Sequence, residues 1–271
     1  MNLPEYQAMF AVEDTHWWYV GLRHQIVTAL RRWTAQRPAG APPVKVLDAG
    51  CGTGGLLAHL SQVNRQVNHR WLVAPARGGG TTARWLAGID LEREGLRLSR
   101  SRGLPNLLQG SVALLPVKSN AFDAVISIDV LCSIGVDEAA AFRELHRILK
   151  PGGLVILQVP AFEWLRSEHD VAVSTKRRYT CHEVNRLAEH TGFMVRQSQY
   201  RNVLLFPVIA VLRLLKRHRA HAEHARSDVK PVPRFLNAIL TRVLIFESHL
   251  LQRVRVPFGL SVFCIGQKKM S

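Results

Sequence analysis

The sequence predicts an α/β protein with a mostly parallel, seven-stranded sheet and helices on both faces. Short apolar runs alternate with helical stretches between residues 44 and 159, which is the pattern of parallel strands joined by crossover helices. Composition agrees, since 47% of the 271 residues are hydrophobic and the mean hydropathy is +0.01. These values fit a chain that buries a core, and they exclude disordered, collagen-like and disulfide-rich classes.

Each expected strand is a short apolar run. The seven runs are Val44–Leu47, Trp85–Ile89, Asn106–Leu108, Phe122–Val130, Leu154–Val159, Phe193–Tyr200 and Leu260–Gln267. The expected core helices are Leu56–Gln62, Leu91–Ser101, Asp137–Leu149 and Thr180–Thr191. Proline and two glycines after Lys150 stop the third helix. Thr180 with Glu183 three residues later forms a capping box at the start of the fourth.

The pattern divides the chain into four segments. We expect an N-terminal helical cap over residues 1–43, a core over 44–200, a basic helical insertion over 201–257, and the last strand with a tail over 258–271. Within the core, Val63–Thr82 has three arginines, no acid and a glycine triplet, which predicts a flexible insertion. The later insertion holds two apolar stretches, Val203–Arg219 and Phe235–Arg253. It separates the last two strands, so we expect it to pack as a cap near that edge.

The charge is strongly positive. The chain has 36 Lys and Arg against 20 Asp and Glu, a net charge of +16, and +10 of this lies in residues 201–271. Such a field favours polyanions, anionic lipid surfaces or phosphorylated substrates, although a basic solvated surface would give the same count. The longest apolar run, Val203–Leu212, is half of the ~20 residues a membrane span needs. The N-terminus has no signal-peptide pattern, and four scattered cysteines show no metal-ligand spacing. We therefore expect a cytoplasmic chain without a metal site.

A glycine-rich loop follows the first strand. Gly50, Gly52 and Gly55 satisfy the GxGxxG dinucleotide pattern, and glycines allow the backbone to approach a ligand closely. Asp48, two residues earlier, would repel a pyrophosphate but suits a cationic ammonium. The residues alone leave open a nicotinamide cofactor, a cationic cofactor or a turn that binds nothing.

The loop Val-Leu-Asp-Ala-Gly-Cys-Gly-Thr-Gly, residues 46–54, resembles motif I of the class I S-adenosylmethionine-dependent methyltransferases, in particular the small-molecule, methyltransferase type 11-like group. The resemblance covers about residues 44–200. Further segments that carry it are Gly88–Asp90, Leu115–Pro116, Phe122–Val130 and Arg143–Gly153. It implies a Rossmann-like sheet and S-adenosyl-L-methionine as cofactor.

The resemblance also implies roles for individual residues. Asp48, Gly50, Cys51 and Gly52 would bind the methionyl end of the cofactor, and Asp90 would bind its ribose. Ser111 and Val112 would border the adenine. Ile128 and Asp129 would border the methyl-transfer region. Asp129 could instead cap a helix. Asp90 lies 42 positions after Asp48, where about 20 is usual, and the insertion Val63–Thr82 accounts for the excess. Cys132 and Ser133 stand where many relatives have Glu-His.

Ligands of open α/β sheets bind beyond the carboxyl ends of the strands, so the segment after Val159 is the expected substrate loop. In it, His169 and Asp170 could act as a general base. Arg177, Arg178 and Tyr179 could hold a phosphate or carboxylate. A structural role for these residues is equally compatible with the sequence. An aromatic cluster at His16–Tyr19, with Arg23, could cover the cofactor or pack on the sheet.

The predicted function is methyl transfer from S-adenosylmethionine to an O or N atom of a small-molecule or lipid-linked acceptor. The alternatives are an NAD(P)-dependent oxidoreductase, a nucleic-acid methyltransferase and a fold without catalysis. Nucleic acid is the least favoured partner, because no Asn-Pro-Pro-Tyr or Pro-Cys motif is present. The basic apolar insertion predicts peripheral association with anionic lipid on the inner face of the membrane. The oligomeric state has no signature in the sequence.

Overall fold

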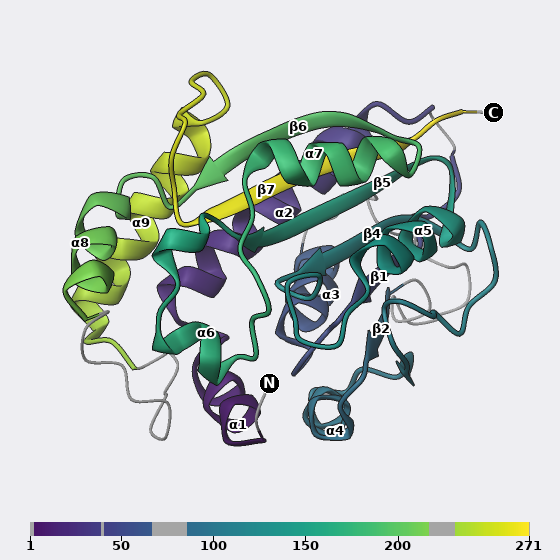
Figure 1. Ribbon diagram of the computed structural model, residues 1–271. Coiled ribbons are helices and arrows are strands. Elements are labelled where there is room, and N and C mark those ends of the chain that lie inside the picture. The colour runs from purple at the N-terminus through teal and green to yellow at the C-terminus, as the bar shows by residue number, and fades with distance from the viewer. Residues whose placement is uncertain (1–2, 39–40, 67–85, 217–230, 271) are drawn as a thin grey trace.

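The computed structural model describes residues 3–38, 41–66, 86–216 and 231–270. Within them, seven strands form one sheet in the order β3-β2-β1-β4-β5-β7-β6 (Figure 1). Strand β7 is antiparallel to β5 and β6, and every other pair is parallel. The predicted fold class is confirmed. The strands are β1 (Val46–Ala49), β2 (Leu86–Asp90), β3 (Leu107–Gln109), β4 (Phe122–Ile128), β5 (Leu149–Pro160), β6 (Phe193–Arg201) and β7 (Ser261–Lys268).

The helices follow the predicted alternation. They are α1 (Leu3–Val12), α2 (Trp17–Ala35), α3 (Gly55–Gln66), α4 (Arg93–Ser101), α5 (Glu138–Ile148), α6 (Glu168–Ala172), α7 (Cys181–His190), α8 (Phe206–Lys216) and α9 (Arg234–Leu250), with a 3-10 turn at Glu163–Leu165. The capping box of Thr180 and Glu183 is present at α7. Helix α3 runs past its predicted end at Gln62, and the rest of the predicted insertion Val63–Thr82 lies outside the described residues.

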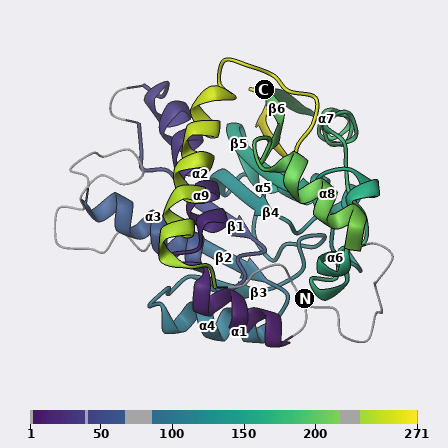
Figure 2. The same cartoon turned by 90° about the vertical axis from the view of Figure 1, so that its left-hand side faces the viewer.

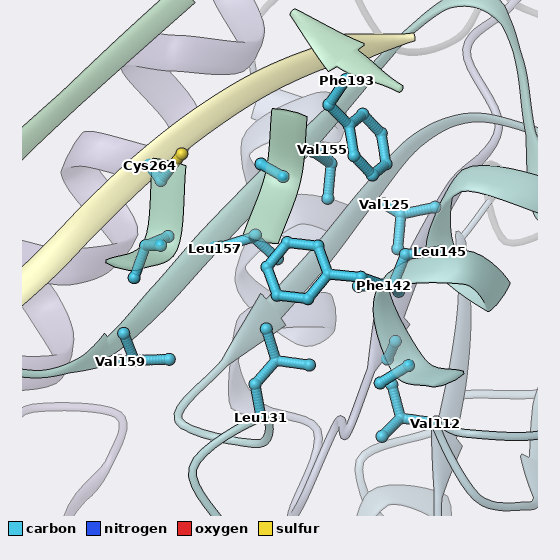
Figure 3. Packing of buried hydrophobic residues seen from close by; sticks show 14 of the residues in the cluster. Val112, Val125, Leu131, Phe142, Leu145, Val155, Leu157, Val159, Phe193 and Cys264 are labelled. Carbon is cyan, nitrogen blue, oxygen red and sulfur yellow. The ribbon is translucent and has the colours of Figure 1, made fainter. Parts of the chain in front are cut away.

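Side chains alternate between the two faces of the sheet along each strand, and both faces are buried. On β5, Val155 and Leu157 belong to a core cluster with Phe142 of α5 (Figure 3). The intervening Ile156 belongs to a second cluster with Ile26 of α2. Helices α5 and α7 therefore cover one face, and α2 and α3 cover the other.

The N-terminal segment forms two helices rather than one continuous run. Helix α2 begins after His16, whose side chain accepts a hydrogen bond from the Trp18 N–H. Ile26 and Leu30 of α2 are fully buried against the sheet. Helix α1 contacts α4 instead, which brings it to the sheet edge where the glycine loop lies.

The insertion between β6 and β7 carries α8 and α9, on the same side of the molecule (Figures 1 and 2). Helix α9 packs along α2, and a Cβ atom at Gly21 of α2 would come within 2.7 Å of Leu244. The carboxylate of Glu247 is buried and accepts the backbone N–H groups of Asn202 and Leu204. No helix within the described ranges combines the length and apolar character that a membrane span requires.

Candidate active site

A cavity of about 1300 Å³ lies beyond the carboxyl ends of β1, β2 and β4. Helices α1, α2, α6 and α8 also contribute to its walls. All nine residues that the sequence predicted to bind the cofactor line it. They are Asp48, Gly50, Cys51, Gly52, Asp90, Ser111, Val112, Ile128 and Asp129.

The glycine loop turns sharply at the end of β1. The backbone N–H groups of Gly50 and Cys51 both donate to the carbonyl of Ile89 on β2, at 2.7 and 2.9 Å. Gly50 has a φ of +93°, and a Cβ atom there would clash with Val130. Glycine is therefore required at this position by both its backbone conformation and the space.

Asp48 is a buried carboxylate at the start of this loop, with 3% of its surface exposed. Burial, with smaller contributions from Asp90 and Glu13, raises its pKa to about 8. Among the described residues, no hydrogen bond or ion pair neutralises it. A buried carboxylate without a cation is costly, so this end of the cavity is electrostatically suited to a positively charged ligand.

Asp90 ends β2 opposite the loop. Its Oδ2 atom accepts the N–H of Gly52 at 2.8 Å, and its Oδ1 atom accepts the N–H of Glu92 at 2.9 Å. The hydroxyl of Tyr6 on α1 donates to Oδ1 at 3.3 Å. A carboxylate has about four lone-pair positions, so it can accept hydroxyl donors from a ligand as well.

Helix α1 covers the glycine loop, which the sequence did not predict. The Glu13 carboxylate, just after α1, accepts a hydrogen bond from the Thr53 hydroxyl and pairs with Arg102 at 2.8 Å. Arg102 also pairs with Asp14 at 2.9 Å. Burial raises the pKa of Glu13 although Thr53 and Arg102 oppose the shift. This pairing joins residues about 90 positions apart, so no local sequence signal reveals it.

Asp129 follows β4 with a φ of +55°, a conformation that Asp tolerates better than most residues. Its Oδ2 atom lies 3.4 Å from Nε2 of Gln158. Burial raises the pKa of Asp129 to about 7, while Gln158 and Arg178 act in the opposite direction. No helix begins at Asp129, so the alternative of a helix cap is not observed.

A protein-family model described as "Methyltransferase domain" matches residues 73–157. That segment contains β2 to β5, which supply Asp90, Ile128 and Asp129. Together with the sheet order and the glycine loop, the match supports a class I S-adenosylmethionine-dependent methyltransferase. The cofactor of this family is S-adenosylmethionine.

Individual relatives differ in their acceptors. Over 166 residues the chain is 31% identical to a glycine/sarcosine/dimethylglycine N-methyltransferase of Actinopolyspora halophila, which covers 57% of this chain and 26% of that protein. Over 141 residues it is 30% identical to a ubiquinone/menaquinone biosynthesis C-methyltransferase of Shewanella woodyi. The match covers 52% of this chain and 51% of that protein. The chain thus spans from a quarter to half the length of these relatives.

A solved structure of phosphoethanolamine N-methyltransferase 2 from Haemonchus contortus, in complex with S-adenosyl-L-methionine, shares the fold. The TM-score is 0.53 at 16% identity, over 91% of this chain and 53% of that one. At this identity the likeness concerns the fold alone.

At the end of the cavity formed by α6 and α8, Asp170 and Arg178 both contribute to the lining, and they adopt the structural pairing that the sequence left open beside a role in the reaction. The two side chains bind each other, with Nε to Oδ1 at 2.8 Å and Nη2 to Oδ2 at 2.9 Å. Both are almost fully buried. Burial would raise the pKa of Asp170, but the bonds from Arg178 outweigh it and hold the pKa below its usual range. The pair therefore holds α6 in place rather than presenting a base or a free guanidinium.

Arg177 and Tyr179 lie outside the lining of the cavity. Tyr179 is in the core and donates its hydroxyl to the Leu131 carbonyl at 3.1 Å. Arg177 lies over the Tyr179 ring and 3.3 Å from Glu138. Neither residue lines the cavity, whereas His169 on α6 does.

Helix α8 contributes three residues to the cavity that the sequence did not single out for the site, namely Ile209, Leu212 and Arg213. The acceptor end thus combines an arginine with apolar side chains. Within the described part of the chain, no group of three or more His, Cys, Asp or Glu residues is arranged to hold a metal ion.

Proposed function

We propose that the chain transfers a methyl group from S-adenosylmethionine to an O or N atom of a small-molecule or lipid-linked acceptor. The observation that carries this proposal is the buried Asp48 carboxylate at the glycine loop, with no cation against it among the described residues. The methionyl part of the cofactor has an ammonium group that would supply the missing charge. A pyrophosphate, as in a nicotinamide cofactor, would be repelled there.

The remaining cofactor contacts follow from the same geometry. Asp90 would accept a ribose hydroxyl on Oδ2, where Gly52 leaves a lone pair available, whereas Oδ1 already accepts from Tyr6 and Glu92. Ser111 and Val112, which follow β3, would border the adenine. Arg23 of α2 lines the cavity beside Glu13 and donates to the backbone carbonyls of Glu13 and Asp14; its remaining N–H groups would face the methionyl carboxylate.

The cavity has room for both reactants, since single-ligand pockets are about 300–1,000 Å³ and this one is about 1300 Å³. When bound, the cofactor supplies a sulfonium methyl group, and the electron pair of the broken C–S bond stays on sulfur. The acceptor atom forms the new bond and loses a proton. Asp129, whose pKa is near 7, would take this proton at neutral pH. His169 is the second group in the cavity that could do so.

We also propose that the acceptor is presented at a membrane, with the chain held peripherally on the inner face. The apolar wall formed by Ile209 and Leu212 supports an acceptor with a hydrocarbon part. Arg213 beside them suits a polar or anionic head group. The relatives named above are an amino-acid N-methyltransferase and a quinone-biosynthesis C-methyltransferase, so acceptor chemistry varies within the family.

Two measurements test the proposal. Calorimetry should show binding of S-adenosylhomocysteine and none of NADH, and Asp48→Asn should weaken that binding. Incubating membrane-containing cell extract with methyl-labelled S-adenosylmethionine should place label in the lipid or small-molecule fraction. Binding of NADH alone would overturn the proposal, and label confined to nucleic acid would replace it with the polynucleotide alternative.

A further inference from the structure

Helix α9 is apolar on the face that points away from the protein. Its inner face packs on α2 through residues such as Leu244 and Glu247, which are buried. On the opposite face Phe235, Ile239 and Phe246 recur at helical spacing and are exposed, Phe235 to 80% and Phe246 to 61%. A helix of a water-soluble surface normally carries polar residues there, so this face is built to contact something apolar.

Helix α8 has the same property. Val208, Val211 and Leu215 lie on one side of the helix, at spacings of three and four residues, and all are more than half exposed. Their common side faces away from Ala210, which is buried. Figures 1 and 2 show α8 and α9 on the same side of the molecule, so one surface can contact both helices.

An aromatic cluster lies at the start of α8. Trp164 packs edge-on to Phe206 at 5.9 Å, and Phe206 packs against Phe258 at 5.2 Å. Trp164 and Phe258 remain exposed, to 45% and 38%. Tryptophan, with an apolar ring and a polar N–H, is typical of the zone between water and the bilayer interior.

The charge beside these faces has one sign. Arg242 lies on the same stripe of α9 as Phe235 and Phe246, Arg253 lies in the turn just after the helix, and both arginines are exposed. Residues 206–216 and 231–257 contain a single acid, Glu247, and it is buried and bonded to backbone N–H groups. Glu163, next to Trp164, is an exposed acid that is paired with Arg166. The surface of α8 and α9 itself is basic and apolar without an exposed acid, and such a surface is complementary to anionic lipid.

We infer that the α8–α9 face, meaning the exposed sides of these two helices with Trp164 and Phe258, docks on the surface of an anionic bilayer. The helices lie in the plane of the interface, with their apolar side chains among the acyl chains and the arginines at the phosphates. This docking stands on the surface itself and does not depend on the proposed reaction.

The docked surface is continuous with the cavity. Leu212 is 49% exposed on α8 and also lines the cavity, as do Ile209 and Arg213 on the same helix. A lipid-linked acceptor would therefore pass from the bilayer along α8 to the acceptor end without crossing water. This second step rests on the proposed methyltransferase function.

Co-sedimentation of the full chain with vesicles tests the docking. One set contains phosphatidylcholine alone, and the other contains equal amounts of phosphatidylcholine and phosphatidylglycerol. At low salt the protein should pellet with the anionic set and much less with the neutral set. The pair Arg242→Gln and Arg253→Gln should weaken partition about 30-fold, because each arginine near the surface contributes about 1 kcal/mol. The pair Phe235→Ser and Phe246→Ser should weaken it at least about tenfold.

Matched controls lie elsewhere on the surface. Leu114→Ser with Met270→Ser removes two apolar side chains that are 78% and 81% exposed. Arg100→Gln with Arg143→Gln removes two exposed charges of α4 and α5. Both control pairs should pellet like the parent chain.

Three results would overturn the inference. The parent chain could fail to pellet with anionic vesicles, or the α9 variants could pellet like the controls. Light scattering could instead show a dimer that the phenylalanine variants dissociate, in which case a second copy covers this face. Calorimetry with S-adenosylhomocysteine on the same variants distinguishes failure of the membrane docking from failure of the proposed function. Docking can be lost while cofactor binding persists, and cofactor binding can be absent while docking persists.

Discussion

The Oδ1 atom of Asn237 accepts a hydrogen bond of 2.8 Å from the backbone N–H of Trp17, 220 residues earlier in the chain. Its Nδ2 atom donates to the carbonyl of Thr15 at 2.8 Å. The insertion helix α9 thus completes the cap of α2, whose own cap, His16, accepts the N–H of Trp18. Because α2 also contributes to the cavity wall, α9 supports the site from outside it.

Asn237→Ala should therefore lower the free energy of unfolding by about 1 kcal/mol, the usual effect of losing an N-terminal cap acceptor. Asn237→Asp keeps the acceptor and should recover part of this loss. Urea unfolding followed by circular dichroism measures both. Thr241→Ala, whose hydroxyl bonds only within α9, is the control and should change stability by less than about 0.5 kcal/mol. Equal losses in Asn237→Ala and Thr241→Ala would contradict the capping role.

Substitutions at Gly50 and Gly103 distinguish the effect of backbone strain from the effect of a steric clash. Both have positive φ, +93° and +76°, but a Cβ atom would clash with Val130 at Gly50 and meet nothing within 4 Å at Gly103. Gly103→Ala should cost about 1 kcal/mol of stability and leave S-adenosylhomocysteine binding unchanged. Gly50→Ala should abolish binding, and adding Val130→Ala should restore part of it. Calorimetry on the four proteins decides, and retained binding in Gly50→Ala would place the ligand away from the loop.

Asp48 should make ligand binding depend on pH. Its raised pKa, about 8, means that the free protein holds a proton there at neutral pH, and an ammonium ligand favours the ionised form. Affinity for S-adenosylhomocysteine should therefore rise about tenfold for each pH unit from 6 to near 8. Asp48→Asn should bind weakly with little pH dependence. A flat profile in the parent chain would show that Asp48 does not face the ammonium.

The same shift affects stability. Because the folded chain binds this proton more tightly than the unfolded chain, the contribution of Asp48 to stability is complete below about pH 4 and is lost as the pH rises toward 8. Asp48→Asn should thus gain stability relative to the parent as the pH rises over this range. Thermal unfolding of the ligand-free proteins at several pH values measures the difference.

Asp170→Asn should be strongly destabilising, because it leaves the buried Arg178 guanidinium without its counter-charge. Breaking a buried pair in this way typically costs about 3–5 kcal/mol. Arg177→Gln, at a residue that is 37% exposed in its ion pair with Glu138, should cost less than about 1 kcal/mol. The pKa of Asp170 is depressed in the folded chain. The stabilisation by this ion pair is therefore present near neutral pH, and it is lost only as the pH falls below the usual pKa of an aspartic acid. Mild effects at both positions would mean that the pair is not structural.

The sequence predicted the sheet well because strand burial and turn chemistry are local. The continuous apolar runs of β4 and β5 and the stop after Lys150 can be read within a few residues. The loop from Asp48 to Gly52 is also contiguous, so its position at the cavity followed from the motif. Long-range contacts were not predictable in this way. The bonds from Tyr6 to Asp90 and from Thr53 to Glu13 depend on how α1 packs across the finished sheet.

The substrate loop shows the same limit. Its residue types suggested chemistry, but type does not determine whether a charged side chain points into a cavity or toward an opposite charge. Asp170 and Arg178 are eight residues apart and satisfy each other in the interior. The role of α8 in the cavity wall was equally hidden, because its apolar pattern is that of any amphipathic helix. Tertiary packing alone distinguishes these outcomes.

The acidic interior of the cavity is enclosed by a chain of net charge +16. S-adenosylmethionine carries a net positive charge, so during its approach it is repelled by the protein as a whole before the carboxylates of the cavity, including the ionised form of Asp48, attract it. Screening by salt, over a Debye length of about 10 Å at 0.1 M, weakens the long-range repulsion more than the short-range attraction. Added salt should thus speed donor capture while it releases the protein from anionic lipid. A higher ionic strength would then raise the rate of S-adenosylmethionine binding and lower the fraction of the protein on the membrane.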